Sequence, residues 1–342
     1  SGQDKFTVNG YIKDSLSGET LIGANIVVRN IGKTVVTNGY GFFSITLPKG
    51  KYQLNASFIG YQTKEITFTL SNNIQQDIQL LPNSAIILQD VTVSARRRDN
   101  NVKTAQMGKM ELSVNTAKAL PAFLGEVDIL KTLQLMPGVR NAGEGNAGFY
   151  VRGGGPDQNL ILLDDAVVYN TGHLFGFFSV FNADAIKNVS LIKGGMPAQY
   201  GGRLSSVVDI AMKEGNTNKT QIDAGIGLIA SRFSIQGPIK QKKSSFIVSA
   251  RRTYIDALTK PLISKSSDFY GSGYYFYDLN AKMNFQISEK DHLYISGYFG
   301  RDKFNFNNAA RSFKTLIDWG NATSTVRWNH IFNKKLFSNT TL

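Results

Sequence analysis

The sequence predicts a multidomain, mainly β protein that ends in the first strands of an antiparallel transmembrane barrel. Three observations support this fold class: short alternating segments over residues 5–81, a mixed α/β pattern further along, and long two-residue alternation beyond Lys219. The expected parts are a β-sandwich over 1–82, an extended segment and linker over 83–101, an α/β domain over 102–215, and part of a barrel over 216–342.

The composition excludes several classes of function. There is no cysteine, so disulfides, thiolate metal sites and cysteine nucleophiles are absent. The net charge is +13, but the basic residues are spread out, and the tight run Arg96–Arg98 has no interleaved aromatics, so we expect no nucleic-acid partner. Excess positive charge also suits a protein surrounded by anionic lipid. No window approaches the ~20 apolar residues of a membrane helix, and we expect any secretory leader before Ser1 to have been removed.

The first part reads as seven short strands with turn residues between them. The expected strands are Phe6–Lys13, Asn25–Asn30, Thr34–Thr37, Phe42–Leu47, Tyr52–Phe58, Glu65–Leu70 and Ile74–Leu80. Spacing of this kind, with Asn38-Gly39, Pro48 and Gly50 at the connections, predicts a small antiparallel sandwich.

This segment resembles the carboxypeptidase regulatory-like domain, which has a transthyretin-like fold. The resemblance rests on Gly10, Gly23-Ala24-Asn25, Asn38 to Phe43 and Gly60-Tyr61. It implies no peptidase, because zinc peptidases need histidine and carboxylate ligands and this segment has no histidine. We expect a rigid spacer or docking module, with ligand binding as the alternative.

An extended segment, Ile87–Ala95, follows the sandwich. Its β-branched residues alternate with short polar ones, so it could add a strand to the open edge of another protein's sheet. The alternative is a last strand of the sandwich. The residues from Arg96 to Asn101 then read as a solvated linker.

The third part mixes helix and strand signals. Apolar residues at helical spacing predict a helix over Gly125–Met136, which Pro137-Gly138 ends. Asn182 suits a helix N-terminus, and strands are expected at Asn188–Lys193 and Ser205–Ala211 with glycine pairs between them. On the residues alone, an ordinary soluble α+β domain is the alternative.

The order of motifs in this part resembles the plug domain of TonB-dependent outer-membrane transporters. The motifs are Leu133 to Val139, Tyr150 to Gly154, Ile161 to Asp164, and Asn182 through Lys193-Gly194 and Tyr200-Gly201 to Ile210. Asp165 stands where that family usually has Gly, and Ala183 where Pro is common, so the local turns can differ. The resemblance implies that Asp90, Val91, Thr92 and Val93 form a TonB box.

Neither the glycines nor the histidines of this chain have the pattern of a dinucleotide site or an active site. Gly143, Gly145 and Gly148 satisfy a G-x-G-x-x-G string, but a helix precedes them and a strand follows, which is the wrong context for a dinucleotide site. The three histidines, His173, His292 and His330, are dispersed, and no catalytic or metal-ligand spacing is present. We expect no enzyme, cofactor or metal.

Beyond Lys219 the strands become long enough to cross a bilayer. The clearest, Tyr275–Ile287, has apolar odd and polar even positions, and exceeds the ~9 to 11 residues that a tilted spanning strand needs. The apolar residues change from even-numbered to odd-numbered positions near Ile229-Ala230, which predicts a tight turn there. Short connections alternate with long ones at Ala257–Gly273 and Phe304–Asn321, as in outer-membrane barrels. The residues expected in an interfacial aromatic girdle are Tyr254, Tyr274, Tyr275, Phe276 and Tyr277. A soluble sandwich with one wet face is the alternative.

The resemblance implies an importer in the outer membrane of a Gram-negative bacterium, with the sandwich in the periplasm. Its expected partners are the inner-membrane TonB complex, outer-membrane lipid and a small ligand, by default an iron chelate, with a glycan or peptide as alternatives. A non-transporting adhesive or structural surface protein is the second hypothesis. The residues expected to contact the ligand are Asn146, Asp157, Gln158, Tyr169, Asn170 and His173. About seven strands cannot enclose a plug, which takes about 22, so we expect a longer chain.

Overall fold

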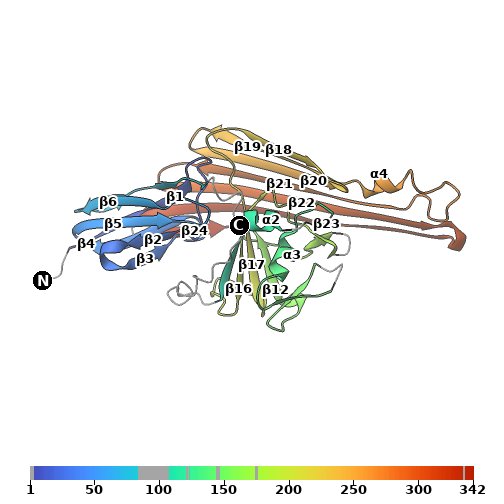
Figure 1. Ribbon diagram of the computed structural model, residues 1–342, viewed down its shortest axis with the longest axis horizontal. Helices are drawn as coiled ribbons and strands as arrows, with labels where there is room; N and C mark the ends of the chain where they lie inside the picture. The colour runs from blue at the N-terminus through green and yellow to red at the C-terminus, as the bar shows by residue number, and fades with distance from the viewer. Residues whose placement is uncertain are drawn as a thin grey trace.

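The computed structural model describes residues 4–83, 108–120, 122, 124–143, 147–173, 176–333 and 336–342. A β-sandwich lies at one end of the long axis, a seven-stranded sheet runs along most of that axis, and an α/β domain packs against one face of this sheet (Figure 1). The predicted fold class, mainly β with these three parts, is confirmed. The predicted TonB box, Asp90–Val93, lies outside the described residues.

The sandwich consists of two four-stranded sheets. One contains β1 (Lys5–Asp14), β4 (Phe42–Pro48), β7 (Ile74–Gln75) and β8 (Ile78–Leu80). The other contains β2 (Asn25–Val28), β3 (Lys33–Val36), β5 (Gly50–Ser57) and β6 (Lys64–Leu70), with a 3-10 turn η1 (Arg29–Ile31) between β2 and β3. Inward residues such as Ile12, Ile26, Phe43 and Leu54 form one buried core between the sheets.

The last strand predicted for the sandwich, Ile74–Leu80, is two short strands, β7 and β8. Both pair in parallel with β1, and the break falls at Gln76 and Asp77. The Asp77 carboxylate accepts hydrogen bonds from the Tyr11 backbone N–H at 2.9 Å and from Lys13 at 2.7 Å. These side-chain bonds replace the ladder bonds at this point, so the pairing is interrupted.

The α/β domain, called the plug below, is built on a five-stranded sheet in the order β13-β12-β17-β16-β9. Its strands are β9 (Lys109–Ser113), β12 (Asn159–Leu163), β13 (Ala166–Val167), β16 (Ile186–Lys193) and β17 (Ser206–Met212); β12 and β17 are parallel. The remaining elements are α2 (Val114–Ala119), α3 (Ile129–Gln134), β10 (Val139–Asn141), β11 (Phe149–Val151), η4 (Pro156–Gln158), β14 (Gly172–His173) and β15 (Phe178–Ser179). A core including Ile129, Leu133 and Phe149 packs helices and sheet together.

Two helix predictions in the plug need correction. Helix α3 is shorter than the predicted Gly125–Met136, because Gly125 has φ +84° and Asp128 caps the helix by accepting from the Lys131 backbone N–H at 3.0 Å. The helix predicted at Asn182 is a single turn in which the Asn182 side chain accepts from the Asp184 backbone N–H at 3.0 Å. From Ile186 onward the chain pairs with β17 as strand β16, so the helical turn does not continue.

The long sheet, called the barrel sheet below, has seven antiparallel strands in sequence order. They are β18 (Gln221–Ile226), β19 (Ala230–Lys240), β20 (Ser244–Thr253), β21 (Gly273–Gln286), β22 (Asp291–Asn308), β23 (Phe313–Asn333) and β24 (Leu336–Thr341), with α4 (Ile255–Thr259) after β20 and η6 (Ala309–Arg311) after β22. The predicted turn near Ile229-Ala230 is confirmed, since the Gly227 N–H donates to the Ala230 carbonyl at 2.8 Å between β18 and β19.

One of the two predicted long connections is wrong. The segment after β20 is long as expected, but Phe304–Asn321 is mostly strand. Pairing of β22 with β23 continues to Asn308 and Phe313, and η6 makes the turn. The alternation of these residues was obscured by consecutive polar and aromatic side chains, whereas the backbone ladder is uninterrupted.

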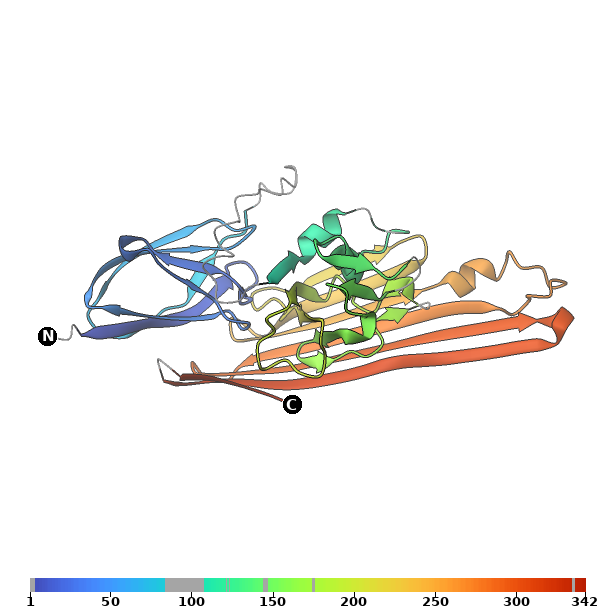
Figure 2. The same cartoon turned by 90° about the horizontal axis from the view of Figure 1, so that it is seen from below.

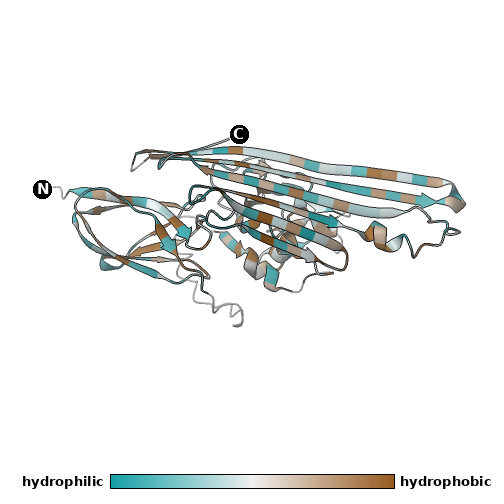
Figure 3. Ribbon diagram, turned by 90° about the horizontal axis from the view of Figure 1, so that it is seen from above, coloured by the Kyte–Doolittle hydropathy of each residue, from teal (hydrophilic) through white to brown (hydrophobic). Residues whose placement is uncertain are grey.

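Side chains of the barrel sheet alternate between the plug face and the opposite face. On β21, Asn280 is 2% exposed and faces the plug, while Leu279 is 45% exposed on the other side. Figure 3 shows the corresponding alternation of hydrophobic and hydrophilic bands along the strands. Tyr274 and Phe276 are buried toward the plug, so they do not belong to the predicted aromatic girdle. Among the described residues, no helix is both long and apolar enough to cross a membrane.

Candidate functional site

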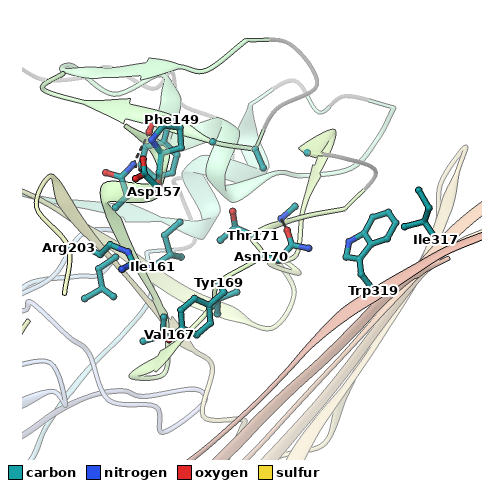
Figure 4. Close-up of a pocket in the computed structure, with 18 residues that line it drawn as sticks. Phe149, Asp157, Ile161, Val167, Tyr169, Asn170, Thr171, Arg203, Ile317 and Trp319 are labelled. Atoms are coloured by element: carbon teal, nitrogen blue, oxygen red, sulfur yellow. Dashed lines mark hydrogen bonds between the residues drawn. The ribbon is translucent and has the colours of Figure 1, made fainter. Parts of the chain in front are cut away.

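A cavity of about 580 Å³ opens between the plug and strand β23. Figure 4 shows Ile317 and Trp319 of the barrel sheet on one side, Asn170 and Thr171 near the middle, and residues of the plug on the other side. A ligand here would touch the plug and the barrel sheet at once. Ligand pockets occur preferentially where domains meet, so this cavity is a candidate ligand site.

The plug side of the cavity is held in place by hydrogen bonds at the start of β12. The Asn159 side chain donates to the Phe149 carbonyl at 2.7 Å and accepts from the Ser206 hydroxyl at 2.7 Å. Pro156 opens the η4 turn immediately before this strand. The exposed carboxylate of Asp157 therefore projects from a turn that is fixed at its C-terminal end.

The loop after β13 forms the second wall and is tied to the barrel sheet. Tyr169 is 81% exposed, and Asn170 accepts a hydrogen bond through its carbonyl from the Asn321 side chain at 2.6 Å. The neighbouring N–H of Val168 donates to the Ile161 carbonyl at 2.9 Å. The exposed ring is thus presented by a backbone anchored on both sides.

The cavity offers an aromatic ring, a carboxylate, an amide and a guanidinium. Tyr169, Asp157 and Asn170 supply the first three, and Arg203 on the loop before β17 supplies the last. Convergent polar groups around aromatic surface suit a ligand recognised by hydrogen bonds and stacking.

Of the residues predicted to contact ligand, Asp157, Tyr169 and Asn170 line this cavity. Gln158 is not among its lining residues, and its carbonyl accepts from the Ser205 backbone N–H at 3.0 Å. Asn146 lies outside the described residues. Sequence reasoning missed Arg203 and Trp319. Trp319 was placed in a loop, and only the continued β22–β23 ladder brings it opposite the plug.

His173 is buried rather than exposed in the cavity, which corrects its predicted place. Its side chain is 1% exposed, with Nδ1 2.6 Å from Asp302 and Nε2 2.8 Å from Asp278, both on the barrel sheet. The ring also stacks on Phe276 with centroids 3.9 Å apart. A histidine in a Gly- and Phe-rich loop gave no sign of these partners, because they follow it by more than a hundred residues.

The geometry fixes the charge of this histidine. A neutral imidazole has one N–H, whereas both ring nitrogens of His173 face a carboxylate oxygen. Only the imidazolium form can donate to both oxygens at once. Burial alone would lower the pKa of His173, but the charge of Asp278 and the hydrogen bonds to Asp278 and Asp302 outweigh it and raise the pKa above 6.5.

Further charged groups surround the two carboxylates. Arg251 of β20 lies 2.6 Å from Asp278, donates to the Ser179 carbonyl of the plug at 2.8 Å, and lies 3.6 Å from Glu126 of the plug. Tyr298 donates to Asp278 at 2.8 Å, and Tyr274 donates to Asp302. We call His173, Glu126, Arg251, Asp278 and Asp302 the clasp, since these buried groups connect plug and barrel sheet.

A second charged contact lies at the turn after β12. Lys282 of β21 is 2.8 Å from Asp164, and Arg327 of β23 is 3.2 Å from Asp165. Both aspartates have positive φ, +47° and +73°. Asp165 therefore adopts the left-handed conformation that favours Gly, and its carboxylate gains a partner on the barrel sheet.

Among the described residues, no group of three or more His, Asp or Glu side chains is placed to hold a metal ion.

Comparisons with known proteins match the first two parts of the chain to domain families. The model of the CarboxypepD_reg-like domain matches residues 8–93, and that of the TonB-dependent Receptor Plug Domain matches residues 105–208. The TonB-dependent receptor SusC of Bacteroides thetaiotaomicron is 27% identical over 231 residues, which are 63% of this chain and 22% of that protein. The chain thus spans about a fifth of this curated relative.

Solved structures of receptors were also matched. The siderophore receptor PirA from Acinetobacter baumannii is 16% identical, with 66% of this chain and 38% of that chain covered and a TM-score of 0.47. A ferric enterobactin receptor mutant, PfeA from Pseudomonas aeruginosa, is 18% identical, with 66% and 39% covered and a TM-score of 0.46.

Proposed function

We propose that this chain is part of a TonB-dependent receptor of the outer membrane, and that the complete protein imports a scarce ligand across that membrane when force displaces its plug. The proposed partners are the inner-membrane TonB complex and a small ligand. The proposed activity is transport, not catalysis.

One observation carries this proposal: the plug packs around its own core, and many of its contacts with the barrel sheet are charged pairs. Its own core is mainly apolar and includes one barrel-sheet residue, Tyr298. The clasp and the Lys282–Asp164 pair cross to the barrel sheet, beside an aromatic cluster that Phe178 forms with β21. Breaking an apolar core is cooperative, but ion pairs between two bodies can be exchanged for water as the bodies separate. A plug attached in this way can be moved without first unfolding the barrel.

The cavity supports a ligand that is both hydrogen-bonded and stacked. An iron chelate is the default class, and a glycan or a peptide is the alternative, since carboxylate, amide, guanidinium and aromatic groups surround the same space. Asp157 and Tyr169 of the plug and Trp319 of the barrel sheet all line the cavity. A ligand bound there would therefore change the contact between the plug and the barrel sheet.

Force is proposed to enter through Asp90–Val93. In the sequence this segment lies between β8, the last strand of the sandwich, and β9, the first strand of the plug. An inner-membrane partner that adds this segment to its sheet would hold it by backbone hydrogen bonds loaded together. A pull on the segment would then reach the plug through the chain itself.

The test is to identify the compound that co-purifies with the full-length receptor by mass spectrometry, and then to measure its uptake by cells. Energised import predicts accumulation that stops when a protonophore removes the proton-motive force, while surface binding persists. Binding without accumulation under either condition would instead favour a surface or adhesion protein.

A further inference from the structure

Residues 14–20 of the sandwich, which run from the end of β1 into the loop before β2, are bonded to residues 214–218 in the connection from β17 to β18. We call these the docking loop and the joint. One carboxylate oxygen of Glu19 accepts from the backbone N–H groups of Glu214 at 2.6 Å and Gly215 at 3.1 Å. Thr217 donates its backbone N–H to the Ser17 carbonyl at 2.8 Å. The sandwich therefore binds the connection between plug and barrel.

The two surfaces fit closely at Gly18. This residue has φ +78°, and a Cβ there would lie 2.1 Å from the Thr217 hydroxyl oxygen. The Asn218 side chain donates to the Leu16 carbonyl at 2.8 Å beside it. Only glycine allows both the left-handed turn and this approach, so the contact is specific in shape as well as in hydrogen bonding.

A buried carboxylate lies where sandwich, plug and joint meet. Glu214 is 5% exposed and is bound by the Thr20 hydroxyl at 2.9 Å and by Lys187 of the plug at 3.2 Å. Burial alone would raise the pKa of Glu214, but the charges of Lys187 and Lys282 outweigh it and lower the pKa to about 2. The carboxylate is ionised here and uses groups from two domains, so separating the sandwich removes one of its partners.

Aromatic contacts extend the interface to the barrel sheet. Tyr11 lies against His292 with ring centroids 5.1 Å apart, and Phe42 stacks on Phe337 at 5.2 Å. Ile331 is buried between them and is 4% exposed. Figures 1 and 2 both show the sandwich at the end of the barrel sheet, beyond the plug. It therefore stands on the side from which an inner-membrane partner would pull.

The interface is nevertheless suited to separation. A polar cavity of about 500 Å³ lies within it, lined by Lys13, Thr20, Glu214, Lys243 and His292 among others. Interfaces with polar, water-accessible interiors resemble those between domains that move relative to each other.

The docking loop also lies next to the point where force would reach the sandwich. Strand β8 ends at Leu80, whose carbonyl accepts from the Ser15 backbone N–H at 2.9 Å, and Leu80 pairs with Asp14 of β1. The chain continues from there toward Asp90–Val93. A pull on that segment would put tension on β8. The hydrogen bond between Ser15 and Leu80 would pass this tension to the docking loop.

We propose that the N-terminal sandwich is a releasable brace, docked on the joint through residues 14–20, and that a pull on the segment after Leu81 undocks it before the plug moves. The proposal rests on the proposed function for the origin of the pull. The docked contact itself does not depend on the ligand or on transport.

The first test is hydrogen exchange in the full-length receptor. Glu19→Ala removes the acceptor of the Glu214 and Gly215 N–H groups, so exchange in residues 214–218 should be at least tenfold faster. Glu65→Ala is the matched control, because Glu65 is an exposed sandwich residue on β6 that bonds Gln53. Unchanged protection of the joint in Glu19→Ala would overturn the docked state.

The second test applies force directly to the receptor in a membrane. An Arg96→Cys handle is available because this chain has no cysteine. Wild type should show a short first rupture before the long extension of the plug; Glu19→Ala should lose that rupture, and Glu65→Ala should keep it.

A pull that extends the plug with no earlier event, or a first event that Glu19→Ala leaves unchanged, would overturn the brace. Neither measurement uses ligand or the inner-membrane partner. A failed importer hypothesis would therefore leave these results intact, and energised uptake without a first rupture would refute the brace alone.

Discussion

The Nδ1 atom of His173 lies 2.6 Å from the Asp302 carboxylate, and this contact passes from the plug to the barrel sheet. Its partner contact from Nε2 to Asp278 makes His173 a bridge between β21 and β22. A single plug side chain therefore holds two neighbouring strands, and its charge balances two buried carboxylates.

Replacing His173 by Ala should loosen the plug. Two aspartates would remain buried with their shared cation gone, and breaking a buried ion pair costs about 3 to 5 kcal/mol. In planar bilayers containing the full-length receptor, the KCl current that reports plug displacement should begin at lower urea than in wild type. His330→Ala is the control, because His330 bonds Asp291 near the β21–β22 turn, away from the plug. An equal onset in the two variants would contradict a holding role for the clasp.

The attachment of the plug to the barrel sheet through His173 should also weaken as the pH rises. The pKa of His173 is raised in the folded protein, so its stabilisation is complete below the unfolded pKa of about 6.5 and is lost as the pH rises through the folded value. The groups facing it are Asp278, Asp302, Arg251, Glu126, Tyr274, Tyr298 and Phe276.

The measurement is the urea onset of the current between pH 6 and pH 10. Wild type should open at progressively lower urea as the pH rises. His173→Gln, which cannot become cationic, should lack this component of the pH dependence. Parallel profiles for the two proteins would assign the effect to another group.

Ligand binding should depend on the cavity residues and not on the clasp. Replacing Asp157 and Tyr169 together by Ala removes a carboxylate and an exposed ring from the cavity, and should weaken binding of the co-purified compound at least tenfold. Glu65→Ala, at a distant exposed position, should bind normally. Full affinity in the double variant would show that the ligand does not bind in this cavity.

The alternation of β21 side chains between the plug face and the opposite face predicts at which positions a charge destabilises the barrel. Leu279→Arg should cost on the order of 2 to 4 kcal/mol if this position lies near the bilayer midplane. Leu279→Met should be tolerated, and Asn280→Asp, which adds charge on the plug face without added volume, should cost less. The fraction of folded full-length barrel in membranes is the readout, and equal losses from Leu279→Arg and Asn280→Asp would refute the parity.

Val91→Pro should abolish energised uptake while ligand binding and outer-membrane abundance persist. Proline removes a backbone donor and fixes φ, so the segment could no longer be added to a partner sheet. Asn100→Pro, in the linker beyond the predicted box, is the matched control and should transport. Normal uptake by Val91→Pro would mean that force enters elsewhere.

Local patterns predicted most of the elements, and the errors have definite causes. The two-residue alternation of β21 and the slip between β18 and β19 depend on neighbouring residues, and both are found. The helix expected at Asn182 is a single turn, because pairing of β16 with β17 outweighs a local capping preference. The loop expected at Phe304–Asn321 is strand, because its order comes from a partner strand rather than from its own pattern.

The sequence by itself determined the order of the parts, the strand periodicity and the turn chemistry, since these depend on residues close together in the chain. Only the tertiary structure decided that His173 lies in a buried clasp, that Trp319 faces the plug cavity, and that Glu19 holds the joint. Each of these contacts joins residues more than a hundred positions apart. Burial and charge pairing at such distances depend on how the folded domains meet, and no local pattern encodes them.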